Sequence, residues 1–375
     1  MAMRILISGA SIAGPVLAYW LTRYGFEVTV VERAPTLRKT GGHAVDLFRP
    51  AMEISAKMGV LPRIEDLATG TTRLTLYREG RPQPSRIDLT KIYAASSDRH
   101  VEIMRDDLSE VYYDAARDDV VVGADGLHSN VRRLTFGDEA GLTRFLGGYL
   151  SVVSAPKTLV GPGEMVGHVG VGRFAGIYTA DHLDDARAVF LFRSAAELAY
   201  DHRDTARQKE LLREAFAGMH DEVDGWLAET ERTPTFYFDS ITQLRTDRWS
   251  RRRVTLVGDA GYCPGPAVGG STSLAVLGAY VLAGELARAD GDHLRAFAAY
   301  ELQMRESVRR SRSFARAAAR GVIPGSRAGV WALTRGAQLV SAMPTSLARA
   351  LAKLNTKGVR MHDSMPVPDY AGSDV

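Results

Sequence analysis

The hydrophobic pattern at the N-terminus alternates between the strand period and the helix period. Arg4 to Ser8 and Glu27 to Val31 are short runs typical of buried strands. The segment from Pro15 to Tyr24 between them has helical periodicity, with a proline in its first turn and Gly25 directly after its end. This order predicts a β-α-β unit.

Two later segments repeat the step from a buried strand into a glycine turn. Val120 to Val122 leads into a turn at Asp125-Gly126, and Val254 to Val257 leads into Gly258-Asp259. After the second turn, an apolar helix is expected from near Ser271 to about Leu286. The chain is therefore expected to contain several strands of one α/β layer, separated by long insertions.

The insertions have a different pattern, with strand-like runs and few long helices. One amphipathic helix is expected from about Thr205 to Phe216. From Gly291 the pattern is helical, with a break at Pro324-Gly325, a last helix from about Arg327 to Leu354 and a loose tail from Met361. The strand-like runs, which predict a mostly antiparallel sheet, are Leu74–Tyr77, Tyr149–Val153, Ala188–Phe192 and Thr235–Phe238.

Composition narrows the class of protein. A chain of 375 residues is expected to form two domains, and 47 basic against 44 acidic side chains argue against nucleic acid as a partner. Cys263 is the single cysteine, which suits a reducing, cytoplasmic location. The longest apolar run, Leu274 to Gly284, is too short to span a membrane, and the histidines show no metal-binding spacing, so neither membrane nor metal is expected.

The first glycine turn resembles a dinucleotide fingerprint. Gly9-Ala-Ser-Ile-Ala-Gly14 opens the first helix, and Glu32 closes the next strand, where a ribose hydroxyl would lie. Ser11 occupies the place of the second glycine. The literal match Gly170-Val-Gly-Arg-Phe-Ala175 lies between strand-like segments without a following helix, so we interpret it as accidental.

The last glycine turn combines a carboxylate, bare backbone and a helix start. After Asp259, a stretch rich in glycine and proline precedes Ser271, which suits a large polar cofactor. Each residue also has a simpler interpretation. Asp259 could cap an ordinary turn, Asp125 could be a turn former, and Arg105, which opens a helix, could be a surface charge.

Together, the three ordered turns resemble the class A flavoprotein monooxygenases, which have the fold of para-hydroxybenzoate hydroxylase. The branch that modifies polyketides and tetracycline-like molecules is the most similar. This resemblance implies a Rossmann-like FAD-binding domain, a mostly antiparallel β-sheet substrate domain and C-terminal bridging helices. The expected boundaries are 1–70, 99–138 and 248–304 for the FAD domain, 71–98 and 139–247 for the substrate domain, and 305–375 for the C-terminal helices and tail.

The resemblance also implies a set of FAD-binding positions. Gly41-Gly42-His43 match the mobile loop near the flavin, and no catalytic acid or base is assigned. The implied contacts are Gly9, Ser11 and Gly14 with the pyrophosphate, Glu32 and Arg33 with the adenosine side, Arg105 with the phosphate region, Asp125 as a brace linked to nicotinamide use, Asp259 with ribityl or phosphate-side oxygens, and Pro266, Gly269, Gly270 and Ser271 beside the isoalloxazine.

The activity implied by this resemblance is hydroxylation of an aromatic or polyketide-type molecule. FAD would be reduced by NADPH or NADH and would react with O2 through a flavin C4a-hydroperoxide, in a monomer or weak homo-oligomer. The alternatives are a flavin-containing non-redox biosynthetic protein, either a binding protein or a cyclase, and a halogenase. A halogenase is disfavoured because its Trp-x-Trp-x-x-Pro segment is missing: Trp20, Trp226, Trp249 and Trp331 are isolated.

Several positions depart from the family pattern. Tyr262 stands where histidine is usual, Ser271 replaces a glycine, and Gly261 replaces a common alanine, so the geometry at the flavin edge is open. Cys263 is interpreted as a small apolar filler rather than a covalent flavin attachment. The stretch between Leu108 and Gly123 is short for the family, and we hypothesise that a segment near Asp114 to Asp119 is missing.

The aromatic residues of the insertions have two interpretations. Phe192, Phe236, Tyr237 and Phe238 lie where substrate contacts are expected, but their period of two is more typical of a buried sheet face.

Overall fold

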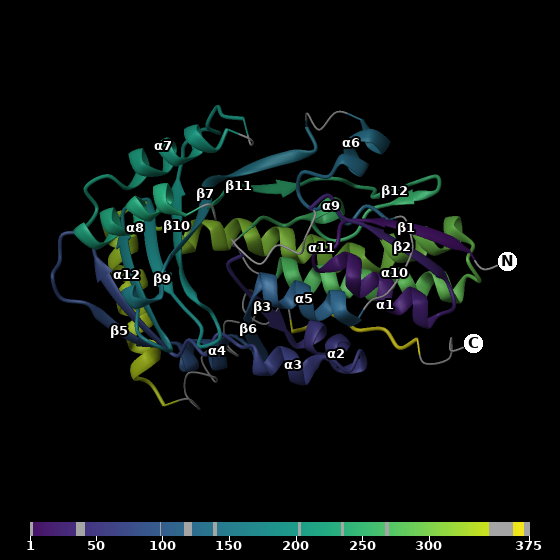
Figure 1. Ribbon diagram of the computed structural model, residues 1–375, viewed down its shortest axis with the longest axis horizontal. Coiled ribbons are helices and arrows are strands. Elements are labelled where there is room, and N and C mark those ends of the chain that lie inside the picture. Colours follow the sequence, from purple (N-terminus) through teal and green to yellow (C-terminus); the bar gives the residue numbers. More distant parts are fainter. Residues whose placement is uncertain are drawn as a thin grey trace.

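The computed structural model is an α/β structure in which a long helix connects two differently built regions (Figure 1). No helix within its described ranges is long and apolar enough to cross a membrane. The structure describes residues 3–34, 42–97, 99–115, 122–137, 141–201, 204–233, 236–266, 270–344 and 363–370.

The first region contains a small parallel sheet. β1 (Arg4–Ser8) pairs in parallel with β2 (Glu27–Val31), and α1 (Ala13–Arg23) connects them. Two isolated bridges extend this pairing, because Gly123 lies parallel to both Ser8 and Leu256. The order across the layer is therefore β2, β1, the 122–123 segment and the 254–257 segment, which makes the strands of all three glycine turns neighbours.

Helices cover this layer and bury its apolar side chains. α1 packs on α10 (Ser271–Arg288), whose inner side chains from Ser273 to Leu286 are all buried. α10 in turn packs along α11 (His293–Val322). The other elements around this layer are α2 (Arg49–Lys57), α3 (Leu61–Asp66), α5 (Arg105–Ala115), α6 (Asn130–Phe136), α9 (Asp259–Tyr262), and the antiparallel pairs β3 (Ala44–Phe48) with β6 (His100–Met104) and β12 (Ser250–Arg251) with β13 (Val254–Thr255).

The second region is a seven-stranded sheet in the order β11-β7-β10-β9-β8-β4-β5. All neighbouring strands are antiparallel except β4 and β8, which run parallel. The predicted mostly antiparallel sheet is thus confirmed. Its strands are β4 (Arg73–Arg78), β5 (Ser85–Asp88), β7 (Thr143–Pro156), β8 (Glu164–Gly170), β9 (Arg173–Tyr178), β10 (Asp185–Arg193) and β11 (Phe236–Leu244), with α4 (Leu89–Ser96) after β5 and the short η1 (Lys157–Leu159) after β7.

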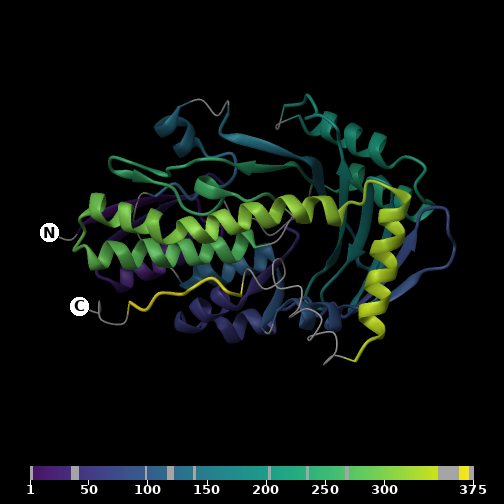
Figure 2. The same ribbon diagram turned by 180° about the vertical axis from the view of Figure 1, so that it is seen from behind.

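Helices pack on both faces of this sheet. α7 (Thr205–Phe216) and α8 (Asp221–Arg232) cover one face, where Phe190 and Phe216 meet edge to face. On the other face, the end of α11 buries Ala315 and Ala319 against the sheet, and α12 (Arg327–Ala342) packs near β5. Figure 2 shows α11 running from the first region to the sheet. The last helix was expected to bridge the two regions, but the helix that connects them is α11, whereas α12 packs on β5 and α4.

The ends of the chain differ from the prediction. α12 ends at Ala342 rather than near Leu354, because Pro344 follows and disfavours a helical conformation in the residue before it. Residues 363–370 are not a loose tail. Tyr370 is buried against α10, its hydroxyl donates to Glu285 at 2.8 Å, and Met365 is buried too. Met365 and Tyr370 thereby belong to the hydrophobic core of the first region.

Three further sequence interpretations have clear outcomes. Gly170 to Arg173 forms the turn of the β8–β9 hairpin, so the literal G-x-G-x-x-A match is accidental. The sequence predicted one helix in the insertion and missed α8, although Asp221 and Glu222 give its first turn the acidic signal of a helix start. The missing-segment hypothesis concerns residues that lie largely outside the described ranges. The domain boundaries stay a prediction.

Candidate active site

The three glycine turns meet at one edge of the parallel layer, which we call the carboxyl edge. Gly9 follows β1, Asp125 follows the 122–123 segment, and Gly258-Asp259 follow the 254–257 segment. The register is fixed by backbone hydrogen bonds, including Ala124 N–H to the Ser8 carbonyl at 2.8 Å and Val257 N–H to the Gly123 carbonyl at 3.0 Å. In open α/β sheets, ligands bind outside the carboxyl ends of parallel strands.

Glycine is required at two positions of this edge because backbone approaches backbone. A Cβ on Gly14 would lie 2.0 Å from the Gly9 carbonyl oxygen, and a Cβ on Gly9 would lie 2.5 Å from the Ala124 carbonyl oxygen. Gly9 also has φ +110°, which other residues rarely adopt. The first and last glycines of the fingerprint therefore close the turn onto the helix and onto the neighbouring strand.

Ser11 connects this turn to α5. Its hydroxyl lies 3.2 Å from the Ser109 hydroxyl and accepts from the Arg105 guanidinium at 3.5 Å. The serine in place of the second glycine thus has polar partners on a different element. Arg105, the first residue of α5, is brought beside the first glycine turn as predicted for a residue near the phosphates.

Glu32 lies at the end of β2 and turns toward the same edge. Its carboxylate accepts from the Ala10 N–H and from the Ala34 N–H, both at 2.9 Å. Arg33 is exposed beside it. The glutamate is thus held at the turn that the fingerprint spacing predicts.

Asp125 is used within its own turn. One carboxylate oxygen accepts from the Ser129 hydroxyl at 2.5 Å and the other accepts from the Val131 N–H at 3.1 Å. Ser129 caps α6 by accepting from the Arg132 N–H at 2.9 Å. Arg132 is fully buried and donates to the carbonyls of Ala260 and Leu127. These contacts tie the second turn to the third, which fits a bracing role for Asp125.

The third turn brings Asp259 and Ser271 together. The Ser271 hydroxyl, at the first residue of α10, donates to the Asp259 carboxylate at 2.5 Å. Gly270 before it has φ +82° and provides no side-chain cap for the helix. Pro266 is partly exposed at the other end of the loop, whereas Gly269 lies outside the described residues, as does Gly41 of the expected mobile loop.

Tyr262 and Cys263, which follow the third turn, are both buried. Tyr262 is buried, lies edge to face with Trp249, and has its hydroxyl 3.0 Å from that of Tyr300. Burial raises its pKa to about 12. Tyr262, which stands where the family usually has histidine, thus fills the core between α9 and α11. Cys263 is fully buried, and burial together with the neighbouring Asp259 carboxylate, which its thiol contacts, raises its pKa.

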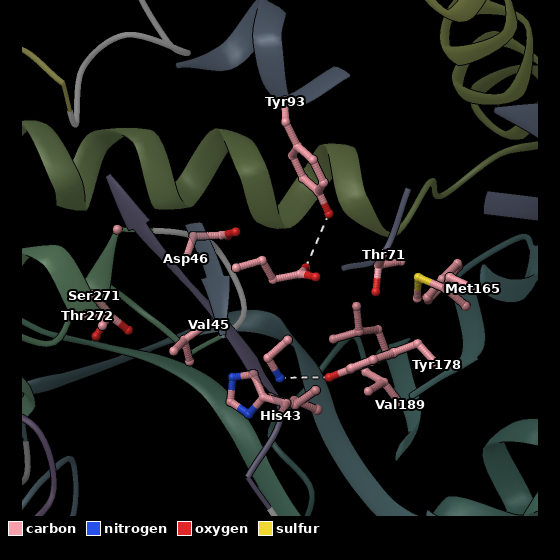
Figure 3. A pocket seen from close by; sticks show the side chains of 16 residues that line it. His43, Val45, Asp46, Thr71, Tyr93, Met165, Tyr178, Val189, Ser271 and Thr272 are labelled. Carbon is pink, nitrogen blue, oxygen red and sulfur yellow. Dashed lines mark hydrogen bonds between the residues drawn. The ribbon is translucent and has the colours of Figure 1, made fainter. Parts of the chain in front are cut away.

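A cavity of about 240 Å³ adjoins the start of α10 (Figure 3). Gly270, Ser271 and Thr272 form its border with the loop of the third turn. One wall is apolar and comes from the large sheet. The polar side chains come mainly from the β3–β6 pair and α4, with Thr71 from the segment before β4 and Tyr178 from β9. The apolar lining residues are Leu150, Met165, Phe174, Val189 and Leu191; the polar ones include His43, Asp46, Thr71, Tyr93, Glu102 and Tyr178.

Burial shifts the pKa of several groups here. Desolvation, with the nearby Arg105 guanidinium, lowers the pKa of His43 to about 4, so this imidazole is neutral at pH 7. Desolvation and then the Asp46 carboxylate raise the pKa of Glu102. Asp106 also has a raised pKa because of burial, and it accepts from the Gly42 N–H at 2.9 Å.

Sequence reasoning missed the polar wall of the cavity. Asp46 and Glu102 lie opposite one another in the β3–β6 pair, an arrangement that no spacing in the chain reveals. The sequence signal that could have indicated this wall is Glu102, a charged residue inside the strand that directly precedes Arg105. The aromatic candidates Phe192 and Phe238 instead stack on Tyr149 in the core beneath α7 and α8, and Phe236 packs at its edge. Tyr237 contacts His43, with ring centroids 6.4 Å apart.

The carboxyl edge defines a dinucleotide-binding α/β enzyme, and comparison with known proteins identifies the family. The FAD binding domain family matches residues 2–119. A flavin-dependent monooxygenase of Legionella longbeachae is 32% identical, and the match covers 83% of this chain and 87% of that protein. An uncharacterized protein of Mycobacterium tuberculosis strain H37Rv is 37% identical, and the match covers 82% of this chain and 91% of that protein. The crystal structure of tetracycline destructase Tet(55) superposes with a TM-score of 0.81 at 29% identity, covering 98% of this chain and 99% of that one.

The chain therefore belongs to the flavin-dependent monooxygenases, and it is an FAD-dependent enzyme. The predicted class A family and its α/β fold are confirmed.

Proposed function

We propose that this enzyme uses NADPH or NADH to hydroxylate an aromatic or polyketide-type small molecule. The observation that carries the proposal is the position of Gly270, Ser271 and Thr272. They belong to the loop after the third glycine turn and also border the cavity, so a cofactor along the carboxyl edge would present its reactive end to a bound molecule. The tetracycline destructases, which share this fold, support a polycyclic aromatic substrate class.

The residues of the carboxyl edge fit FAD. Neither α1 nor α10 has a side-chain cap, so their first N–H groups are available to oxygen atoms such as those of a pyrophosphate. Glu32 and Arg33 would bind the adenosine side, Ser11 and Arg105 the phosphates, and Asp259 the sugar-alcohol chain. Pro266, Gly269, Gly270 and Ser271 would border the isoalloxazine, while Asp125 would brace the turn.

When bound, reduced FAD supplies the activated oxygen that a hydroxylase inserts. The protein's own part is to hold the substrate ring and to exclude water. The sheet wall of Leu150, Val189 and Leu191 presents apolar side chains to one side of the cavity, and the opposite wall orients polar groups. The start of α10 directs its positive dipole end toward this point, where it would stabilise negative charge.

The single buried cysteine and the near-balanced charge suit a cytoplasmic enzyme without a nucleic-acid partner, acting as a monomer or weak homo-oligomer.

Aerobic turnover tests the proposed function directly. The purified protein is expected to be yellow, to release its FAD on denaturation, and to oxidise NADPH or NADH faster when a substrate is present. Phenols, anthraquinones and tetracyclines form the substrate panel, and product mass is the readout. A gain of one oxygen atom supports the proposal. Failure of both nicotinamides to reduce the bound flavin would contradict it and favour a non-redox flavoprotein.

A further inference from the structure

The two walls of the cavity differ in charge as well as in polarity. Asp46 and Glu102 both line it, whereas its described lining contains no lysine or arginine. His43, the histidine in the lining, is neutral at pH 7 because its pKa is lowered to about 4. The described lining therefore presents carboxyl groups without a lysine or arginine among them, while Arg105 lies near His43 outside the lining.

Glu102 is held with both carboxylate oxygens accepting hydrogen bonds. The Thr69 hydroxyl donates to one oxygen at 2.5 Å and the Tyr93 hydroxyl donates to the other at 3.2 Å (Figure 3). Asp46, its neighbour across the β3–β6 pair, is contacted by the His100 ring nitrogen at 2.6 Å. Glu102 is thus fixed as an acceptor at the polar wall.

Thr71 gives an independent indication that a polar ligand group belongs here. Its hydroxyl is buried, lines the cavity, and has no hydrogen-bond partner within the described part of the chain. Buried polar atoms in folded proteins nearly always have a partner. Figure 3 shows Thr71 beside Met165 among the lining residues, where a bound molecule would supply a partner.

We propose that this cavity binds an uncharged or cationic aromatic ligand through a hydrogen-bond donor, such as a ring hydroxyl, placed against Glu102 and Thr71, and that it rejects aromatic carboxylates. The ligand donor would form a further hydrogen bond to the Glu102 carboxylate and would give the Thr71 hydroxyl a hydrogen-bond partner. The ring would lie on the apolar side chains of the large sheet. A ligand carboxylate would instead bring a further negative charge beside Asp46 and Glu102 with no lysine or arginine among the described lining residues to pair with it.

The size of the cavity narrows the ligand class. About 240 Å³ lies below the roughly 300–1,000 Å³ typical of pockets for drug-sized ligands. A ligand of two or three fused rings therefore fits better than a four-ring tetracycline. The proposal rests on the proposed function, because it assigns the substrate class of the same site.

Matched probes test this assignment. 2-Naphthol and 2-naphthoate share the same ring system and differ in carrying a neutral hydroxyl or a carboxylate. Calorimetric titration of each into the FAD-loaded, oxidised enzyme at pH 7.5 measures binding without turnover. We expect 2-naphthol to bind at least about tenfold more tightly than 2-naphthoate. Equal or tighter binding of 2-naphthoate, or no binding of either probe, would overturn the proposal.

Substitutions assign the selectivity to the named residues. Glu102→Gln keeps a hydrogen-bonding side chain but removes the charge, so it is expected to reduce the ratio of the two affinities at least threefold. Thr71→Val is expected to weaken 2-naphthol binding. The control is Glu164→Gln, because Glu164 also accepts from a threonine hydroxyl, at 2.7 Å, but does not line the cavity. An equal change in the control, or an unchanged ratio in Glu102→Gln, would contradict the assignment.

Two readouts keep the result interpretable. FAD content and thermal unfolding of each variant show whether the protein remains folded and loaded. Flavin reduction by NADPH or NADH, measured in the same preparation, reports on the proposed monooxygenase function. If the flavin is not reduced but the affinity ratio holds, the proposed function fails and the ligand assignment stands. If the flavin is reduced but the affinity ratio is lost, the proposed function stands and the ligand assignment fails.

Discussion

The carboxyl edge and the cavity beside it are built in opposite ways. The carboxyl edge is made mainly of backbone, with glycines at Gly9, Gly14 and Gly258 that allow close approach. The cavity is made of side chains from the large sheet, β3, β6, α4 and the start of α10. A cofactor shared by a family can be held by backbone geometry, whereas a substrate must be distinguished by side-chain chemistry. Substitutions at the carboxyl edge should therefore act on folding and cofactor binding, whereas substitutions in the cavity should act on substrate selectivity.

The largest effect is expected from adding one methyl group to the carboxyl edge. In Gly14→Ala, the Cβ would lie 2.0 Å from the Gly9 carbonyl oxygen, and neither backbone segment can move without displacing the strand. We expect a loss of roughly 3–5 kcal/mol in the free energy of unfolding, together with loss of bound FAD. Urea unfolding and the ratio of flavin to protein absorbance measure both.

Gly225→Ala provides the matched control for that experiment. Gly225 lies inside α8, and a Cβ there would meet nothing within 4 Å. Alanine is expected to be neutral or to stabilise the helix by up to about 1 kcal/mol. If Gly14→Ala retained FAD and unfolded like this control, the carboxyl edge would not depend on close backbone approach.

A smaller effect is expected from removing the Asp259 side chain, whose carboxylate lies at the carboxyl edge. Asp259→Ala removes a carboxylate that the Ser271 hydroxyl holds at 2.5 Å. Hydrogen bonds to charged groups contribute about 1.5–3 kcal/mol, so FAD is expected to bind about tenfold or more weakly to the apoprotein. Fluorescence titration with FAD measures the affinity.

Ser271→Ala sharpens this result. It leaves the carboxylate in place and removes its donor, so its effect on FAD affinity is expected to be smaller than that of Asp259→Ala. Unchanged FAD affinity in Asp259→Ala would show that this carboxylate is an ordinary turn residue.

The smallest expected effect concerns His43, which lies where the two regions meet. Its pKa is about 4 in the folded protein against an ordinary value of 6.5, so between these values the unfolded chain binds a proton that the folded chain does not. Stability should therefore fall as the pH decreases from 6.5 to 4, by at most about 3 kcal/mol from this group. His43→Gln is expected to flatten that part of the profile.

Urea unfolding of the wild type and His43→Gln between pH 7 and pH 4.5 measures this contribution as the difference between the two profiles. His293→Gln, a substitution at the start of α11, is the control for losing a histidine elsewhere. Parallel profiles for the wild type and His43→Gln would show that His43 is protonated as readily in the folded protein as in the unfolded chain.

Much of the fold could be predicted from local patterns. The strands at Arg4–Ser8 and Glu27–Val31 coincide with β1 and β2, and the expected helix at Thr205–Phe216 coincides with α7. These segments were predictable because periodicity, caps and turn residues agree over a short stretch of chain. α12 was predicted too long because its helical periodicity continues past Pro344, where backbone sterics override it.

The carboxyl edge was largely predictable and the cavity was not. Residues of the fingerprint lie close together in sequence, so Gly9, Gly14 and Glu32 could be assigned from spacing. The surroundings of Tyr262 could not be predicted, because its position in the loop is visible in the sequence, whereas the direction of its side chain depends on packing against Trp249 and Tyr300. Glu102 gave a weak signal, because a charged residue within a strand is more often solvated.

The sequence by itself determined the glycine turns, the strands that precede them and the family to which they belong, because each depends on backbone conformations that few residue types allow. Only the tertiary structure decided that these turns share one edge, and that Asp46, Thr71 and Glu102 face the same cavity. Contacts between residues far apart in the chain follow from packing of whole elements, and that packing is not encoded in any short pattern.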